Sequence, residues 1–519
     1  MASTHPFRAV PEETDSRVNE RQLGVKVALG LVAALSVVVQ AGVLARAGAS
    51  VSEFMKWQVV PLMLLSLLVA AAFRNSKYRL EIVAIVITAL SLRSALGMHM
   101  YTEVLSGKGF GSLFVKDDRY FFDLGRQLAD GWRFGGYAPR LGDATQPGQV
   151  YLNAIVIYLA GADPRNVVVV SSMMGAATTA LLIPVASSFV RGGWVLVPAA
   201  LFAILPHQIY LSAANQRDVA ITLFAVVLVA TLLRAQRTAH QSRDVAMASL
   251  AVIALLGLLA AWRFASALAA ALAVLAWALL ASPPPRARWS AMVMLLMVAL
   301  LSMAFLAPDS SVEQGPLADL AAIDSAYGNQ FGSADTFGGF QEAGEVGRVL
   351  FLPLTIPLSV VFGFVPYADI INNDLNSLGF LYVWYPLVPP MVLGSVIIIR
   401  RWRWSAVALW GPALLLLLIG AVSYYGLVPR FRSSAEPFLL VAATVGLVRL
   451  RGLLPVYLPG ILLACICVNV IVWAPSLLPV LGAGALAGVC AVGILWAQHL
   501  VRNRRALRKV SSHARDLVA

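Results

Sequence analysis

The chain has 519 residues, of which 59% are hydrophobic and only 13% are charged, and its mean hydropathy is +0.79. About a quarter of the residues of a soluble protein are charged, so this composition excludes an ordinary soluble domain and predicts a polytopic membrane protein. The expected fold is all-α, because a bilayer offers no water to satisfy the backbone. The net charge of +13 does not indicate a nucleic-acid partner, since the cations form short clusters between apolar runs that fix helix orientation.

The N-terminal part is predicted to cross the membrane three times. Residues 1–23 are polar and are expected to form a disordered cytoplasmic tail, and the region 24–100 holds spans near 24–45, 57–73 and 80–100. The region 101–165 then lies outside as an acidic loop with interfacial helices. Its apolar stretch 149–161 is too short to cross and is expected to lie at the membrane surface.

The rest of the chain continues as apolar runs. We predict a transmembrane region 166–307, an exterior loop with a broken or re-entrant segment at 308–377, C-terminal spans at 378–498 and a basic cytoplasmic tail at 499–519. The predicted spans of these regions lie near 166–189, 194–211, 218–234, 245–262, 264–281, 290–307, 378–399, 405–425, 432–450, 453–474 and 476–498. The whole is a bundle of about 13 or 14 transmembrane helices.

The distribution of charge predicts a plasma-membrane protein with both termini in the cytoplasm. Most of the 39 Lys and Arg then face the cytoplasm, as the positive-inside rule requires, and most of the 26 acids fall outside. The active face is therefore expected to be extracytoplasmic. Membrane lipids surround the bundle, and the tail cations Arg502, Arg504, Arg505, Arg508 and Lys509 are suited to anionic lipid.

A run of acids and aromatics follows the third predicted span, beginning Asp117-Asp118-Arg119-Tyr120. Helical spacing of the apolar residues after it predicts a helix that stops at Gly131. One acid is accounted for as the N-cap of this helix, which is the simpler interpretation. The second acid is surplus to capping, and a carboxylate at the mouth of a cavity can take a proton from a hydroxyl or ligate a divalent cation. Asp117 and Asp118 are therefore the candidate catalytic residues.

Two more junctions that are expected outside are rich in polar groups. The first contains His207, Arg217 and Asp218, and it is interpreted either as a polar hairpin with Asp218 as a helix cap or as a shelf for a phosphate or sugar. His207 reads more simply as an interfacial histidine than as a metal ligand. The second contains Arg430 and Arg432, whose planar forks suit phosphate. Side chains that snorkel to lipid headgroups are the alternative there.

Together these stretches resemble the GT-C-fold glycosyltransferases, the broad group of protein O-mannosyltransferases and bacterial lipid-linked sugar transferases. The resemblance is carried by Asp117–Tyr120 with Gly125–Gly131, by the block from Pro147 to Asp218, and by Arg430–Phe438. It implies a GT-C-like bundle that transfers a sugar, with inversion, from a polyprenyl-phosphate donor to a glycan, lipid or protein acceptor on the extracytoplasmic face.

The resemblance also implies roles for individual residues. Asp117 or Asp118 would act as the base or orient the acceptor, often near a divalent cation such as Mg²⁺ or Mn²⁺. Arg430, Arg432 and Arg217 would hold the donor phosphate, and the other substrate-binding candidates are Tyr120, His207 and Asp218. In the family the acid motif typically follows the first span, whereas here it follows the third, so the acceptor is not inherited from the resemblance.

Two other functions remain open at this point. A polymerase or ligase of lipid-linked glycans also uses exterior arginines, but it would not need the pair of acids. A transporter or flippase of lipids or glycans would instead place charges in the middle of the membrane on the substrate path. Arg93 is the clearest charge within a predicted span.

Overall fold

The computed structural model describes residues 15–105, 117–135, 147–238, 242–280, 383–424, 433–455, 457 and 459–461. All regular elements in these ranges are helical, which confirms the predicted all-α class. The contacts divide the chain into two compact units. Unit 1 is Met1–Ile183, Val195–Ile204 and Gln208–Leu223, and unit 2 is Pro184–Trp194, Leu205–His207 and Phe224–Ala519.

Several predictions fall outside the described residues. These are the loop and re-entrant segment at 308–377, the spans near 290–307 and 476–498, most of the span near 453–474, and the tail at 499–519. The total number of crossings therefore stays a prediction.

Five helical segments in the described ranges are long and apolar enough to cross a membrane. They are Leu23–Arg46, Val51–Ala72, Arg79–Thr102, Pro164–Ala186 and Asp218–Arg237. These segments make the chain a multi-pass membrane protein. The apolar helix α6 (Pro147–Ala160) is shorter than these segments, and its position at the membrane surface stays a prediction.

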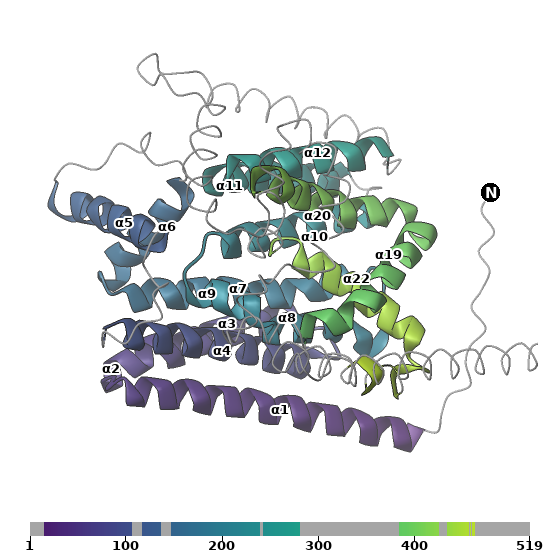
Figure 1. Cartoon of the computed structure of the whole chain (residues 1–519), viewed down its shortest axis with the longest axis horizontal. Helices are drawn as coiled ribbons and strands as arrows, with labels where there is room; N and C mark the ends of the chain where they lie inside the picture. Colours follow the sequence, from purple (N-terminus) through teal and green to yellow (C-terminus); the bar gives the residue numbers. More distant parts are fainter. Residues whose placement is uncertain are drawn as a thin grey trace, which may run out of the picture. The chain divides into compact units, whose positions relative to one another are not determined.

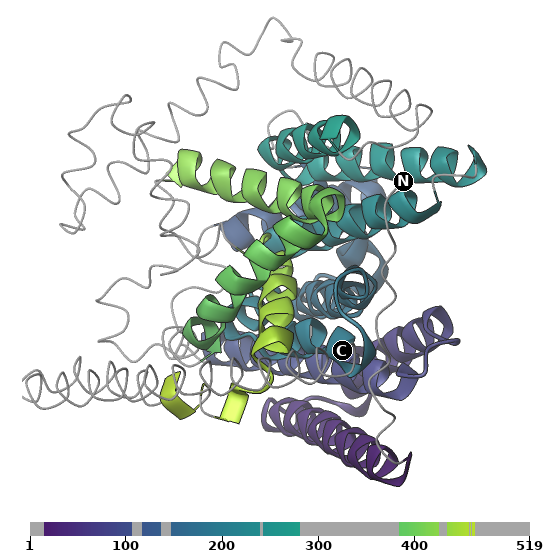
Figure 2. The ribbon, with the colours of Figure 1, turned by 90° about the vertical axis from the view of Figure 1, so that its right-hand side faces the viewer.

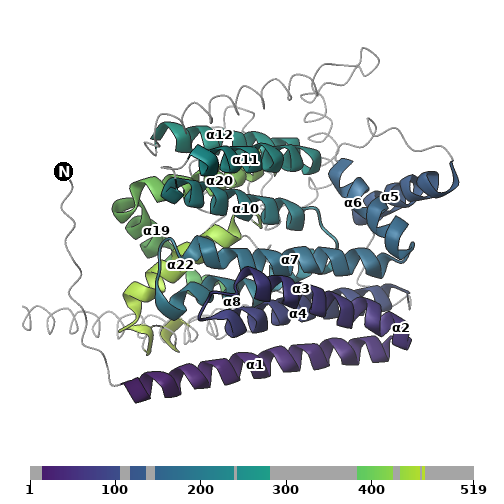
Figure 3. The ribbon, with the colours of Figure 1, turned by 180° about the vertical axis from the view of Figure 1, so that it is seen from behind.

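Unit 1 is built around α4 (Arg79–Leu105), which packs along α1 (Asp15–Arg46), as opposite views show (Figures 1 and 3). The second span combines the short α2 (Val51–Phe54), a π-helical turn (Met55–Val59) and α3 (Val60–Ala72), which also contacts α4. The apolar window of α4 is 67% buried, whereas that of α1 is 22% buried. The exposed apolar side chains of α1 are what a lipid-facing helix requires.

The sequence predicts one straight span near 194–211, and the structure differs there. A 3-10 turn (Gly192–Leu196) leads into α8 (Val197–Ile204), and α9 (Pro206–Ala213) follows at a bend of 54°. The physical reason is Pro206, which has no backbone N–H and restricts the residue before it. This broken pair would bring the number of possible spans in the described residues to six.

Unit 2 contains two pairs of packed helices. In one pair, α12 (Phe264–Leu280) lies against α20 (Arg403–Tyr424), and α11 (Ser242–Trp262) packs on α12. In the other pair, α19 (Val388–Arg401) lies against α22 (Glu436–Leu450), drawn in green and yellow-green in Figure 2.

Glycines let the second pair approach closely. A Cβ at Gly394 of α19 would overlap the Ala442 carbonyl of α22, and a Cβ at Gly446 of α22 would overlap the Pro390 carbonyl of α19. Small residues at such crossings are how membrane helices gain packing contacts that lipid cannot replace.

Candidate functional site

The acid motif begins the amphipathic helix α5 (Asp117–Phe134). Helix α5 lies beside α6 (Figure 1). Its apolar face, which includes Phe121, Phe122 and Leu128, is buried against α6 in one cluster. Gly125 permits this contact, since a Cβ there would lie 2.7 Å from Asn153 Cβ of α6. The opposite face carries the exposed pairs Arg119–Asp123 and Arg126–Asp130, which stabilise the helix only slightly.

The predicted end of this helix at Gly131 is wrong by one turn. The helix continues to Phe134, and Gly135 ends it with φ of +67° while its N–H donates to the Gly131 carbonyl at 3.0 Å. Glycine is favoured in this left-handed position, and Gly131 is tolerated inside the helix.

Asp117 and Asp118 occupy the first turn of α5. Carboxylates are stabilised at this end of a helix by the unpaired N–H groups and the helix dipole. Their side chains lie outside the described part of the structure, so their catalytic role stays a prediction. Tyr120, in the same turn, is 47% exposed and makes an edge contact with Phe121.

The structure brings Arg217 next to the first turns of α5. Its guanidinium carbon lies 6.0 Å from the ring centroid of Phe121, and the Arg217 side chain is almost fully buried. Such a contact is a weak cation–π attraction. Asp218 follows as the first residue of α10 (Asp218–Thr238) and is buried as well. Of the predicted site residues, Tyr120, Arg217 and Asp218 therefore belong to one unit with the start of α5.

The turn that holds Arg217 has a defined backbone. The N–H of Asn215 donates to the Ser212 carbonyl and that of Gln216 to the Leu211 carbonyl, with Asn215 at φ of +51°. This is a Schellman motif, and asparagine tolerates its left-handed position better than most residues do. The turn that carries Arg217 and Asp218 is therefore rigidly connected to α9.

Buried amides connect this turn to α6. Gln149 Nε2 donates to Asn215 Oδ1 at 3.1 Å and to the Asn215 carbonyl at 3.4 Å, and Asn153 lies beside both side chains. All three side chains are at most 2% exposed. Gln149 and Asn153 give no local motif in the sequence and were not predicted, whereas Asn215 stands in the polar junction that contains Arg217 and Asp218.

His207 has a partner that the sequence did not suggest. In unit 2, His207 Nδ1 lies 3.2 Å from Glu436 Oε1, and the two side chains are 7% and 0% exposed. This contact fixes the orientation of the imidazole ring, and the tautomer of His207 decides which atom is the donor. Glu436 stands in the same sequence block as Arg430 and Arg432, but those two arginines lie outside the described residues.

We expect Glu436→Ala to lower the stability of the folded protein by about 1–3 kcal/mol, because the buried contact between the carboxylate and His207 Nδ1 would be lost. Glu436→Gln should lose less, since the amide oxygen can still accept the hydrogen bond. Thermal unfolding of the purified variants measures this difference. Thr444→Val is the matched control on α22, because Thr444 is equally buried and its hydroxyl donates within its own helix, to the Leu440 carbonyl. An equal loss in Glu436→Ala and Thr444→Val would contradict a specific His207–Glu436 pair.

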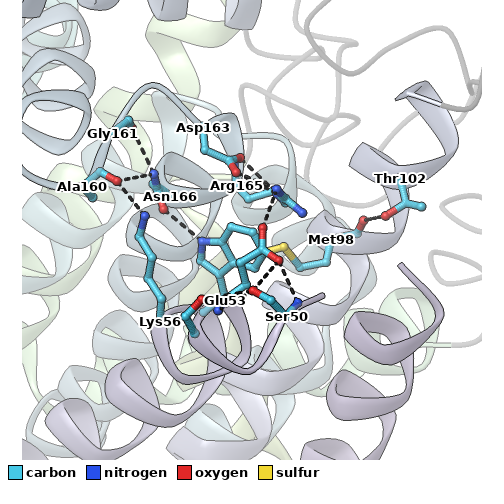
Figure 4. A network of polar contacts seen from close by, with 12 residues as sticks. Ser50, Glu53, Lys56, Met98, Thr102, Ala160, Gly161, Asp163, Arg165 and Asn166 are labelled. Carbon is cyan, nitrogen blue, oxygen red and sulfur yellow. Dashed lines mark hydrogen bonds and ion pairs between the residues drawn. The ribbon is translucent and has the colours of Figure 1, made fainter. Parts of the chain in front are cut away.

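A further polar network in unit 1 connects the second span to the corner between α6 and α7 (Pro164–Ala186) (Figure 4). Arg165 pairs with Asp163 at 2.7 Å and with Glu53 at 3.2 Å, and its guanidinium lies 3.8 Å from the ring centroid of Trp57. Trp57 Nε1 donates to Asn166 Oδ1 at 2.9 Å. These contacts hold the corner in which α6 ends, and α6 in turn supports α5.

Within the described side chains, no group of three His, Cys, Asp or Glu is placed to hold a metal ion. These residues therefore provide no donor set for the predicted divalent cation, and the metal requirement stays a prediction.

No protein-family model matches the chain, and no curated protein matches it in sequence. Solved structures of an oligosaccharyltransferase from Archaeoglobus fulgidus are similar at 14–15% identity. The match to the structure with zinc and sulfate covers 77% of this chain and 52% of the oligosaccharyltransferase chain, with a TM-score of 0.44. The match to the structure with an inhibitory peptide and a dolichol-phosphate covers 74% of this chain and 51% of that chain, with a TM-score of 0.45. The chain thus spans about half the length of these proteins, and a TM-score below 0.5 assigns it neither activity nor ligand.

The described residues define a multi-pass helical membrane protein. In one unit an amphipathic helix begins with two acids and packs on a buried arginine, and in the other a histidine is paired with a buried glutamate.

Proposed function

We propose that this protein is a GT-C-type integral-membrane glycosyltransferase. It moves a sugar from a polyprenyl-phosphate donor to a glycan, lipid or protein acceptor on the extracytoplasmic face of the plasma membrane, with inversion at the anomeric carbon. The contact between α5 and Arg217 carries the proposal, because it brings the helix that starts with Asp117 and Asp118 to a guanidinium.

The proposed reaction is a single displacement. The acceptor oxygen attacks the anomeric carbon, its proton passes to the carboxylate of Asp117 or Asp118, and the bond from the anomeric carbon to the phosphate oxygen breaks. The bonding electrons leave with polyprenyl phosphate, and attack opposite the leaving group inverts the configuration.

Each residue type suits its part of this step. A carboxylate positioned at a helix start can act as a general base. Negative charge grows on the leaving phosphate, and guanidinium groups stabilise it with paired hydrogen bonds. In the proposal Arg217, Arg430 and Arg432 take this role, and Tyr120, His207 and Asp218 contribute to the binding of the substrates.

The test is an in vitro transfer assay with the full chain in lipid. Radiolabelled polyprenyl-monophosphate sugars and crude membrane acceptors are supplied with EDTA, with Mg²⁺ or with Mn²⁺. Label should move from one donor to an acceptor. The comparison of transfer with EDTA, with Mg²⁺ and with Mn²⁺ tests the predicted requirement for a divalent cation. Polyprenyl-diphosphate glycans form a parallel set of donors. Transfer from these alone, or no transfer by well-folded protein, would contradict the proposal and favour the polymerase, ligase or flippase alternatives.

Arg217→Gln is expected to lower this transfer by about a hundredfold to a thousandfold, because the leaving phosphate loses a cation. Arg217 is buried, so a thermal unfolding curve on the same preparation separates the loss of transfer from any loss of folded protein. The control is Arg126→Gln on the exposed face of α5, where Arg126 pairs with Asp130 at the surface. Transfer by Arg217→Gln at the rate of the control would contradict the role of Arg217.

A further inference from the structure

Arg93 is a fully buried cation in the middle of the span formed by α4. In the described part of the chain no carboxylate forms an ion pair with it; its guanidinium instead donates to backbone carbonyls. A buried charge in a membrane span is costly and calls for a specific role.

The carbonyls that Arg93 binds belong mainly to the end of α8. Its Nη2 donates to the Phe202 carbonyl at 2.9 Å, and its Nη1 donates to the Ala203 carbonyl at 3.1 Å and to the Ala89 carbonyl of its own helix at 3.0 Å. The guanidinium carbon also lies 5.4 Å from the Phe202 ring centroid. Both residues of α8 are 1% exposed.

Pro206 explains why these carbonyls need a donor. In a continuous helix, the Phe202 carbonyl would accept a hydrogen bond from the N–H of residue 206. Proline has no N–H, and the span bends by 54° at this point. A carbonyl left unsatisfied within a membrane costs several kcal/mol, and the end of a helix carries partial negative charge. A guanidinium stabilises this helix end in two ways, because its N–H groups donate to the free carbonyls and its positive charge offsets their partial negative charge.

The neighbouring helix leaves room for this guanidinium only because residue 175 is glycine. A Cβ at Gly175 of α7 would lie 2.7 Å from Arg93 Nε and 2.5 Å from Ser212 Oγ of α9. Arg93 therefore stands where α4, α7, α8 and α9 meet within unit 1. The two carbonyls of α8 set its orientation there.

We infer that Arg93 is a positioning residue that replaces the backbone donor removed by Pro206 and so fixes the break between α8 and α9. The break directs α9, which begins with His207 in its first turn and ends in the Asn215 turn before Arg217. The consequence for transfer rests on the proposed function. The role of Arg93 at the break does not rest on the proposed function. It explains a charge in the middle of the membrane without a transport path for a substrate.

The experiment removes the donor and then restores it from the backbone. Arg93→Met takes away the guanidinium, and the added substitution Pro206→Ala returns an N–H that can donate to the Phe202 carbonyl. Pro184→Ala is the matched control, because Pro184 is another proline inside an apolar helix, α7. Arg93→Lys is the conservative variant. Folded yield of the full chain and hydrogen exchange of the segment 199–213 are measured in lipid, with sugar transfer as the last readout.

Exchange in the segment should rise about tenfold in Arg93→Met, and less in Arg93→Lys. Pro206→Ala should reverse most of this rise, whereas Pro184→Ala should not. Transfer should stay low in Arg93→Met with Pro206→Ala, because the restored helix is straighter. Where Arg93→Met does not fold, the folded yields of the two double variants replace the exchange comparison. Equal effects of Pro206→Ala and Pro184→Ala would overturn the inference. A wild-type chain without transfer would contradict the proposed function alone, since the exchange result does not depend on activity.

Discussion

Asp117→Asn is expected to lower sugar transfer by about two to four orders of magnitude, which is the usual contribution of a general base. Asparagine keeps the size and much of the capping ability of aspartate, so the folded protein should lose at most about 1 kcal/mol. The transfer assay and a thermal unfolding curve on the same preparation separate the two effects. Asp118→Asn is measured in parallel, because only the comparison tells which of the two acids takes the proton.

Asp123→Asn is the control for this experiment. Asp123 is on the same helix, is exposed, and pairs with Arg119 at 3.6 Å, so its loss should change transfer little. If Asp117→Asn and Asp118→Asn reduce activity only in proportion to folded protein, the acids serve as helix caps and the proposed chemistry is wrong.

The second large effect concerns the crossing of α19 and α22. Gly394→Ala and Gly446→Ala should each destabilise unit 2 by at least about 3 kcal/mol, because the added Cβ meets a backbone carbonyl that cannot rotate away. The two helices would have to separate, so the whole contact between them would be lost. Loss of monodisperse protein on extraction, and a lowered unfolding temperature, measure this effect.

Gly257→Ala provides the opposite expectation in the same unit. Gly257 lies inside α11, and nothing would stand within 4 Å of its Cβ. Alanine there should raise stability by up to about 1 kcal/mol, because it favours the helix more than glycine does. If all three variants behave alike, the close approach of α19 and α22 is contradicted.

The spans of the chain could be predicted well where hydrophobicity alone decides them. The predicted spans 24–45, 80–100 and 166–189 agree within a few residues with Leu23–Arg46, Arg79–Thr102 and Pro164–Ala186. The break at Pro206 was missed because the apolar composition continues through it. Composition records where a chain is apolar, whereas a bend depends on which backbone groups have partners.

The candidate site was predictable only in part. Asp117, Arg217 and His207 stand out because polar groups are rare beside apolar runs. The partners of such residues cannot be recognised in the sequence, because they are far away along the chain. Glu436 is 229 positions from His207, and the Gln149–Asn215 contact spans 66 positions. Such pairs depend on how helices cross, and a single sequence carries no record of that.

The Arg165 network also sets an order of events during synthesis. Glu53 and Arg165 are separated by 112 positions, so at ordinary translation speeds Arg165 is synthesised on the order of ten seconds after Glu53. During that interval Trp57 and Glu53 are already made while the corner that receives them is not. The contacts between the second span and this corner can therefore form only after the start of α7 has been made.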